Sequence, residues 1–144
     1  MYSLLLPLIV IVLIGLSALR RSQFISEEKA FETVRTFLKS NPLVQNGQKT
    51  FDLSFLKDVT NGNDAAEDRF QANPPTLVEG KGEQESLYLV GFEEVYGSRN
   101  AISTGSSFWR FSWNRPGVLD ESYTFYVNAT SGALSLIGHF QSPD

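Results

Sequence analysis

Side chains in the second half of the chain alternate with the two-residue period that is typical of β-strands. The alternating runs cover residues 87–92, 108–113, 123–128 and 134–137 and are rich in aromatic and β-branched residues. Turn-forming sequences at 114–117 and 128–132 separate the last three runs, and Gly132 is suited to a positive φ angle. Because short connections join antiparallel neighbours, the pattern predicts an antiparallel sheet of about four strands.

One amphipathic helix is predicted before the sheet, over residues 26–40. Ser26 is suited to the N-cap, and two glutamates follow it in the first turn, where the helix dipole favours anions. Pro42 ends the helix, because the residue before a proline avoids the α region. Helical spacing places three apolar side chains on one face: Phe31, Val34 and Leu38. We therefore expect an α+β fold in which this helix packs on the sheet.

The chain between the helix and the sheet, residues 42–85, shows no sustained period. It contains turn-forming Asn, Asp and Gly residues at 60–64 and an extended sequence, Asn73-Pro74-Pro75. A chain of 144 residues has the length of one typical domain. We expect a single α+β domain over residues 22–144, with residues 42–85 as a loop-rich excursion packed over it.

The beginning of the chain is uncharged and strongly apolar over residues 2–19. As a helix this stretch would be about 27 Å long, close to the hydrocarbon core of a bilayer, which is about 30 Å thick. We expect a transmembrane anchor over residues 1–21 in contact with membrane lipid, with Arg20 and Arg21 at the interface. The expected anchor side chains are Leu4, Leu5, Leu8, Ile9, Ile11, Leu13 and Leu16. A cleaved signal peptide is the alternative, although no basic residue precedes the apolar run.

The orientation of this expected anchor is set by its flanking charges. Both arginines follow the apolar run, which favours a domain on the cytoplasmic side. Beyond them the chain carries ten basic and sixteen acidic side chains. An anionic membrane surface would repel such a domain, so we expect it to stand off the membrane.

The helix and the last hairpin resemble those of PepSY-type domains, which begin a helix with a sequence like ISxEEA and end in a hairpin like Y-x-V-D-A-x-T-G-x-V. This chain has Ile25-Ser-Glu-Glu-Lys-Ala30 and Val127-Asn128-Ala129-Thr130-Ser131-Gly132-Ala133-Leu134, with Asn128 in place of the usual Asp. The resemblance covers residues 25–40 and 107–138. It implies a cystatin-like helix-on-sheet fold, no catalysis, binding or restraint of a partner protein, and an extracytoplasmic domain. The sequence Leu38-Lys-Ser-Asn-Pro-Leu-Val44 is also similar to small anchored subunits of mitochondrial import and oxidase-assembly machinery.

The composition excludes several kinds of chemistry. Without cysteine, the chain cannot form disulfides, zinc–thiolate sites, iron–sulfur clusters or a thiol nucleophile. His139 is the one histidine in the sequence, and it is expected to be a surface or capping residue. The formal net charge of −4 argues against a nucleic-acid partner. We therefore expect no catalytic residue, no metal and no cofactor.

Aromatic side chains lie on both faces of the predicted strands. A single helix covers only one face of a sheet, so the other face is expected to expose aromatic side chains to a partner. The candidate contact residues are Tyr88, Phe92, Phe108 and Tyr126. The alternative is that residues 42–85 fold back and cover this second face.

Together these features favour a non-catalytic, single-pass membrane protein, an accessory subunit that binds and braces a larger membrane protein complex. The alternative is a filament or surface subunit, similar to a pilin, that assembles through its hydrophobic N-terminal helix. Pilin-like helices follow a charged leader, and no such sequence precedes Leu4. The sequence therefore favours the accessory subunit.

Overall fold

The computed structural model describes residues 23–60, 70–80, 91–102, 105–115 and 121–141. Within these residues, the helices are α2 (Glu27–Ser40), α3 (Ser54–Thr60) and the 3-10 helix η3 (Arg99–Ala101). The strands are β1 (Leu43–Asn46), β2 (Lys49–Asp52), β3 (Gln71–Ala72), β4 (Thr76–Glu79), β5 (Phe92–Gly97), β6 (Ser107–Asn114), β7 (Glu121–Asn128) and β8 (Leu134–Gln141).

Six of these strands form one antiparallel sheet, and β1 and β2 form a separate hairpin. The order in the main sheet is β3-β6-β7-β8-β5, and β4 also pairs with β6. Because β7 pairs with one side of β6 along its whole length, β3 and β4 share the other side. The short strand β4 therefore lies at an edge of the sheet, and β5 lies at the opposite edge.

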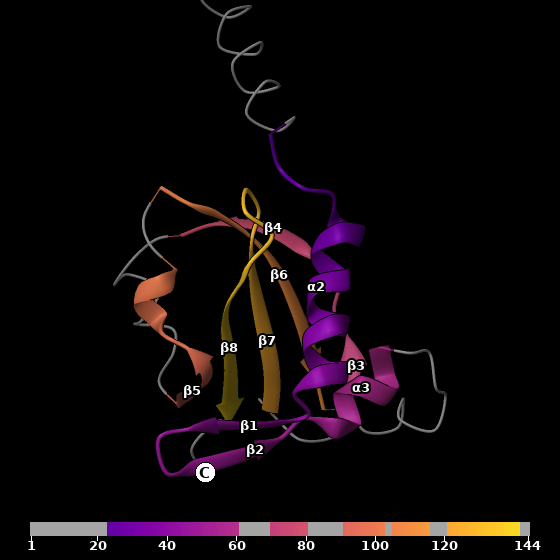
Figure 1. Cartoon of the computed structure of the whole chain (residues 1–144), viewed down its shortest axis with the longest axis vertical. Coiled ribbons are helices and arrows are strands. Elements are labelled where there is room, and N and C mark those ends of the chain that lie inside the picture. Colours follow the sequence, from indigo (N-terminus) through magenta and orange to yellow (C-terminus); the bar gives the residue numbers. More distant parts are fainter. Residues whose placement is uncertain (1–22, 61–69, 81–90, 103–104, 116–120, 142–144) are drawn as a thin grey trace, which may run out of the picture.

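Helix α2 begins and ends close to the predicted residues. The Ser26 hydroxyl accepts a hydrogen bond from the Lys29 N–H at 3.3 Å, which confirms the predicted N-cap. At the other end, the Asn41 N–H donates to the Phe37 carbonyl at 2.8 Å. The helix packs on β6 and β7, as Figure 1 shows. Its fully buried side chains are Ala30, Val34 and Leu38.

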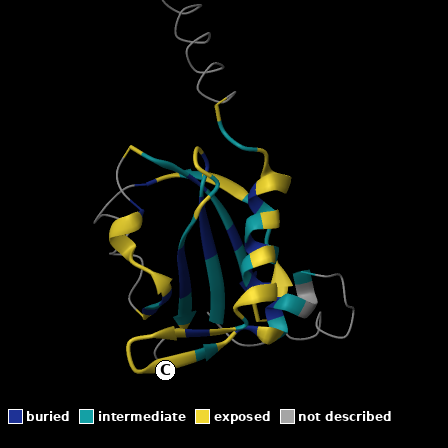
Figure 2. Ribbon diagram, in the orientation of Figure 1, coloured by how far each residue is buried: buried dark blue, intermediate teal, exposed yellow. Residues whose placement is uncertain are grey.

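An apolar core lies on each face of the main sheet. The larger core lies between the sheet and α2, and its buried strand residues include Phe111, Trp113, Phe125, Val127 and Ile137. The smaller core lies on the opposite face and contains Phe92, Ile102, Phe108, Tyr126 and Leu136. Buried residues concentrate in the central strands, whereas exposed residues follow the β1–β2 hairpin and the outer side of α2 (Figure 2).

The β1–β2 hairpin and α3 close one end of the larger core. Asn46 of the hairpin donates a hydrogen bond from Nδ2 to the Glu94 carbonyl of β5 at 2.7 Å. Lys49 forms an ion pair with Glu93 on the same strand. Three residues of this segment are buried in the core: Val44, Leu53 and Leu56. The hairpin is therefore a fixed part of the fold.

The predicted architecture of one helix on about four strands is wrong. The main sheet has six strands within the described residues, and the predicted loop-rich excursion over residues 42–85 supplies β1 to β4 and α3. These elements are too short for a period to emerge, and β4 pairs with β6 far along the chain. The predicted strands over 108–113, 123–128 and 134–137 are present as β6, β7 and β8.

The expectation of a single-pass membrane protein is also corrected. No helix in the described part of the chain combines the length and the apolar character needed to cross a bilayer. The longest of these helices, α2, has 14 residues and buries only one face. The expected anchor, residues 1–21 with Arg20 and Arg21, lies outside the described residues.

Candidate binding site

The segment before α2 is fastened to the sheet by two hydrogen bonds. The Ile25 N–H donates to the Ala129 carbonyl in the β7–β8 turn at 2.8 Å. The indole N–H of Trp109, on β6, donates to the Ile25 carbonyl at 2.9 Å. These bonds hold the preceding residues, Gln23 and Phe24, beside the end of the sheet.

The β7–β8 turn is rigid because one side chain organises its backbone. The Asn128 Oδ1 accepts hydrogen bonds from the N–H groups of Thr130 and Ser131, each at 2.9 Å. The Gly132 N–H donates to the Asn128 carbonyl at 2.8 Å, and Gly132 has the predicted positive φ, 74°. The Thr33 hydroxyl of α2 donates to the Gly132 carbonyl at 3.1 Å. The turn is therefore tied to the helix.

Strand β4 has a free outer edge in the described part of the chain. Its residues pair with β6 from Thr76 opposite Arg110 to Glu79 opposite Ser107, and no other described strand pairs with it. The Gly80 N–H continues this ladder with a hydrogen bond to the Ser106 carbonyl at 2.8 Å. Leu77, at the centre of the strand, is 41% exposed.

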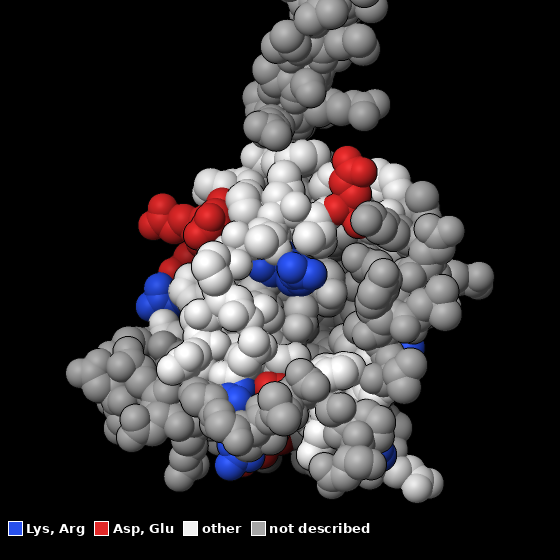
Figure 3. Space-filling model, turned by 180° about the vertical axis from the view of Figure 1, so that it is seen from behind, with Lys and Arg blue, Asp and Glu red and all other residues white. Residues whose placement is uncertain are grey.

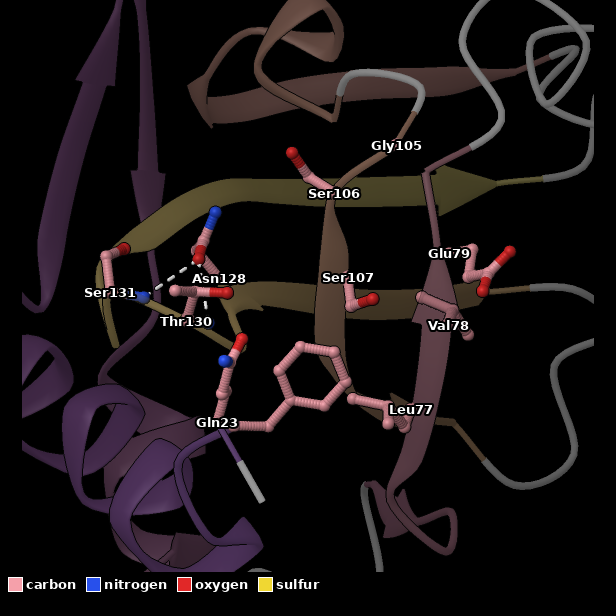
Figure 4. A pocket seen from close by; sticks show the side chains of 11 residues that line it. Gln23, Leu77, Val78, Glu79, Gly105, Ser106, Ser107, Asn128, Thr130 and Ser131 are labelled. Carbon is pink, nitrogen blue, oxygen red and sulfur yellow. Dashed lines mark hydrogen bonds between the residues drawn. The ribbon is translucent and has the colours of Figure 1, made fainter. Parts of the chain in front are cut away.

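The fastened segment, the rigid turn and β4 surround a hollow of about 1050 Å³. Figure 4 shows the hydroxyl and amide side chains of the turn on one side of the hollow and the side chains of Leu77, Val78 and Glu79 on β4 on the other. The lining residues are Gln23, Phe24, Leu77, Val78, Glu79, Gly105, Ser106, Ser107, Asn128, Thr130 and Ser131. We call this the β4 hollow.

The lining of the β4 hollow suits the binding of a polypeptide. Its hydroxyl and amide groups can donate and accept hydrogen bonds, and Phe24, Leu77 and Val78 provide apolar contact area. Glu79 is the one charged side chain among the lining residues. Among the described lining residues, no imidazole lies beside the serine hydroxyls.

The predicted partner contacts on the second face are largely covered. Phe92, Phe108 and Tyr126 come together in the smaller core, and each is at most 7% exposed. Ile102, which follows η3, packs with them. Of the residues in 42–85 that the structure describes, Val78 also packs against the cluster. The fourth residue, Tyr88, lies outside the described residues. Phe92, Phe108 and Tyr126 therefore form part of a core and do not form an exposed contact surface.

The sequence did not point to β4 as a binding element. Residues 76–79 are too few to show alternation, and the two prolines before them indicate an extended loop equally well. The one available signal is Asn128-Ala129-Thr130-Ser131-Gly132, whose turn chemistry predicts a rigid hairpin end.

His139 lies on the opposite end of the sheet from the hollow, next to β5. Its ring stacks on Tyr123 at a centroid distance of 4.5 Å, and its Nε2 atom is 3.6 Å from the Glu121 carboxylate. Burial, followed by the carboxylates of Glu121, Glu93 and Asp52, raises the pKa of Tyr123 above its ordinary value. The side chain of His139 is 14% exposed, so it is partly buried beside Tyr123 and Glu121.

No relative is found. Comparison of the chain with protein-family models, with curated proteins and with solved structures gives no match. The resemblance to PepSY-type domains stays a prediction. Function must be inferred from the geometry of the chain itself.

Proposed function

We propose that this domain is a non-catalytic binding module, an accessory subunit that holds an extended segment of a partner protein along β4. The partner segment would add a strand to the main sheet and place side chains in the β4 hollow. This role keeps the accessory function predicted from the sequence but assigns its contact surface to the sheet edge.

The observation that carries the proposal is the direction of the backbone groups on β4. The hydrogen bond from the Gly80 N–H to the Ser106 carbonyl shows that the even-numbered residues of this segment direct their backbone N–H and C=O groups toward β6. In an antiparallel pair the intervening residues face away, so Leu77 and Glu79 direct their N–H and C=O groups outward. A second hydrogen bond, from the Ala129 N–H to the Ser107 carbonyl, supports this assignment. Ser107 lies opposite Glu79 and directs its carbonyl toward β7, so it is not hydrogen-bonded to Glu79.

The short edge also explains why pairing would be selective. β4 has four residues and follows Pro74 and Pro75, which lack N–H groups, so a long unrelated strand cannot extend along it. Two outward residues offer only a few backbone hydrogen bonds, each worth about 0.5–1.5 kcal/mol. A partner therefore needs further contacts, and the exposed Leu77 and the adjoining hollow supply them.

Site-specific photo-crosslinking in the native cell tests this proposal. A photoreactive amino acid replaces Leu77 on β4 or, as the matched control, Leu43, which is a strand leucine with 62% exposure at the other end of the domain. We expect one defined crosslinked partner from position 77 and none from position 43. Equal labelling from both positions, or none from position 77, would contradict the proposal, and a crosslink to a second copy would indicate self-assembly instead.

A second pair of variants separates backbone pairing from side-chain contact. Leu77→Pro removes an outward N–H without removing a bond to β6, whereas Leu77→Ala keeps that N–H and removes the side chain. With the photoreactive residue moved to Glu79, we expect Leu77→Pro to lower partner affinity about two- to tenfold. Far-UV circular dichroism checks that the variant is folded.

A further inference from the structure

A second depression lies between the N-terminal end of α2 and the β3 end of the sheet. It has a volume of about 490 Å³. Phe31 of α2 and Pro75, just before β4, form its walls, Phe111 and Trp113 of β6 form its floor, and Glu27 and Glu28 lie at its rim. We call it the α2 groove.

The lining of the α2 groove below its rim is mostly aromatic and apolar, and its polar members are Thr60, Asn73 and Ser112. The ring of Phe31 lies 5.4 Å from that of Phe111 and 6.4 Å from that of Trp113, and the latter pair is nearly parallel at 28°. Phe111 and Trp113 are each 3% exposed, so they give a fixed base, and the half-buried Phe31 completes the surface. An aliphatic stem would fit against such rings.

The rim of the α2 groove carries negative charge that the described structure does not neutralise. Within the described residues Glu27 and Glu28 form no ion pair, whereas Glu32, one turn further along, pairs with Arg35 at 2.7 Å. The positive end of the helix dipole, about half a unit charge, offsets only part of two carboxylates. The rim therefore favours a cation.

We propose that the α2 groove binds a lysine or arginine side chain of the partner protein. The aliphatic stem lies against Phe31 and Trp113, and the charged head reaches Glu27 and Glu28. The chain already contains one such contact, because the guanidinium carbon of Arg35 lies 6.0 Å from the centroid of the Phe31 ring.

The groove adjoins the proposed strand-pairing edge. Pro75 lines the groove and Leu77 lines the β4 hollow, and two residues of a strand span about 7 Å. A segment paired with β4 therefore passes the groove within the reach of one long side chain. The assignment of the side chain to that segment rests on the proposed function, but the chemistry of the groove does not.

The test uses the full chain and three blocked tripeptides with a central arginine, citrulline or norleucine. Citrulline keeps the shape of arginine without its charge, and norleucine keeps only the aliphatic stem. The readout is the indole N–H resonance of Trp113 in nitrogen-15 NMR spectra, which Trp113→Phe identifies because the chain has two tryptophans. We expect the arginine peptide to shift this resonance and to bind at least five times more tightly than the other two.

Variants of the rim test the charge contribution. The double substitution Glu27→Gln and Glu28→Gln is expected to reduce binding of the arginine peptide to the level of the citrulline peptide. Glu93→Gln, which removes one negative charge from β5 at the opposite edge of the sheet, is the matched control and should leave binding unchanged. Circular dichroism confirms that α2 remains folded in the double variant.

The outcomes distinguish this inference from the proposed function. Equal binding of the three peptides, no shift of Trp113, or an unchanged affinity in the double variant would overturn it. Binding of the arginine peptide without any crosslink from position 77 would support the groove and contradict strand pairing at β4. A crosslink from position 77 without peptide binding would support strand pairing at β4 and contradict the groove.

Discussion

Gly138 on β8 is the position at which the packing of the second face can be tested most directly. A Cβ atom added there would lie 1.8 Å from Cζ and 1.9 Å from Cε2 of the Phe92 ring. The guanidinium carbon of Arg99 is 5.1 Å from the centroid of the same ring, and its Nη2 donates to the Phe92 carbonyl at 2.9 Å. The Phe92 ring is therefore held in place, and moving it aside would cost free energy.

We predict that Gly138→Ala destabilises the fold by about 1–2 kcal/mol. Overpacking of a core costs about 1–3 kcal/mol, whereas alanine in a strand is favoured over glycine by about 0.5–1 kcal/mol. The difference between the middles of these two ranges is about 1.3 kcal/mol, and it is the expected loss in the free energy of unfolding, which urea denaturation followed by circular dichroism measures.

The second substitution Phe92→Leu removes the part of the ring that clashes. We expect the double variant to be more stable, by about 1 kcal/mol or more, than the sum of the two single effects on the free energy of unfolding predicts. Gly47→Ala is the control. A Cβ atom at Gly47 meets no atom within 4 Å, and Gly47 has a φ of 61°. This substitution therefore loses stability through backbone strain alone. Neutral or stabilising behaviour of Gly138→Ala, or additive effects in the cycle, would refute the proposed packing.

Two further predictions concern the turn and the opposite end of the sheet. Asn128→Ala should lower the free energy of unfolding by about 1 kcal/mol, because two turn N–H groups lose their acceptor, whereas Asn128→Asp, which keeps that acceptor, should be close to wild type in the same urea assay. The pKa of Tyr123 is raised in the folded state, so the stabilising effect of the neutral phenol is full below pH 10 and is lost as the pH rises through the folded-state pKa. Tyr123→Phe should therefore lose less stability than wild type as the pH rises above about 10, the ordinary pKa of tyrosine, and identical pH profiles would contradict the assignment.

The parts of the fold that the sequence predicts well have strong local signals. Helix α2 has a capping serine, acidic residues in its first turn and a proline after its end, and all three act within a few residues. The long strands β6 and β7 show clear alternation because one face packs on α2 and the other on a second core.

The parts that the sequence predicts poorly depend on distant partners. β4 is a strand because β6 offers it a hydrogen-bonding edge, and four residues carry too little pattern to indicate this. In β5, the adjacent Glu93 and Glu94 interrupt the apolar pattern because they pair with Lys49 and Arg99. The β4 hollow and the α2 groove combine residues from several elements, so no single stretch of sequence identifies either of them.

The two hydrogen bonds at Ile25 link the geometry of the β4 hollow to the path of the chain that enters the domain. Gln23 and Phe24 form a wall of the hollow, and the next residue, Ile25, is hydrogen-bonded to Ala129 and to the Trp109 indole. Ile25 also directly precedes Ser26, the N-cap of α2. One wall of the hollow and the start of the helix therefore share a single point of attachment to the sheet.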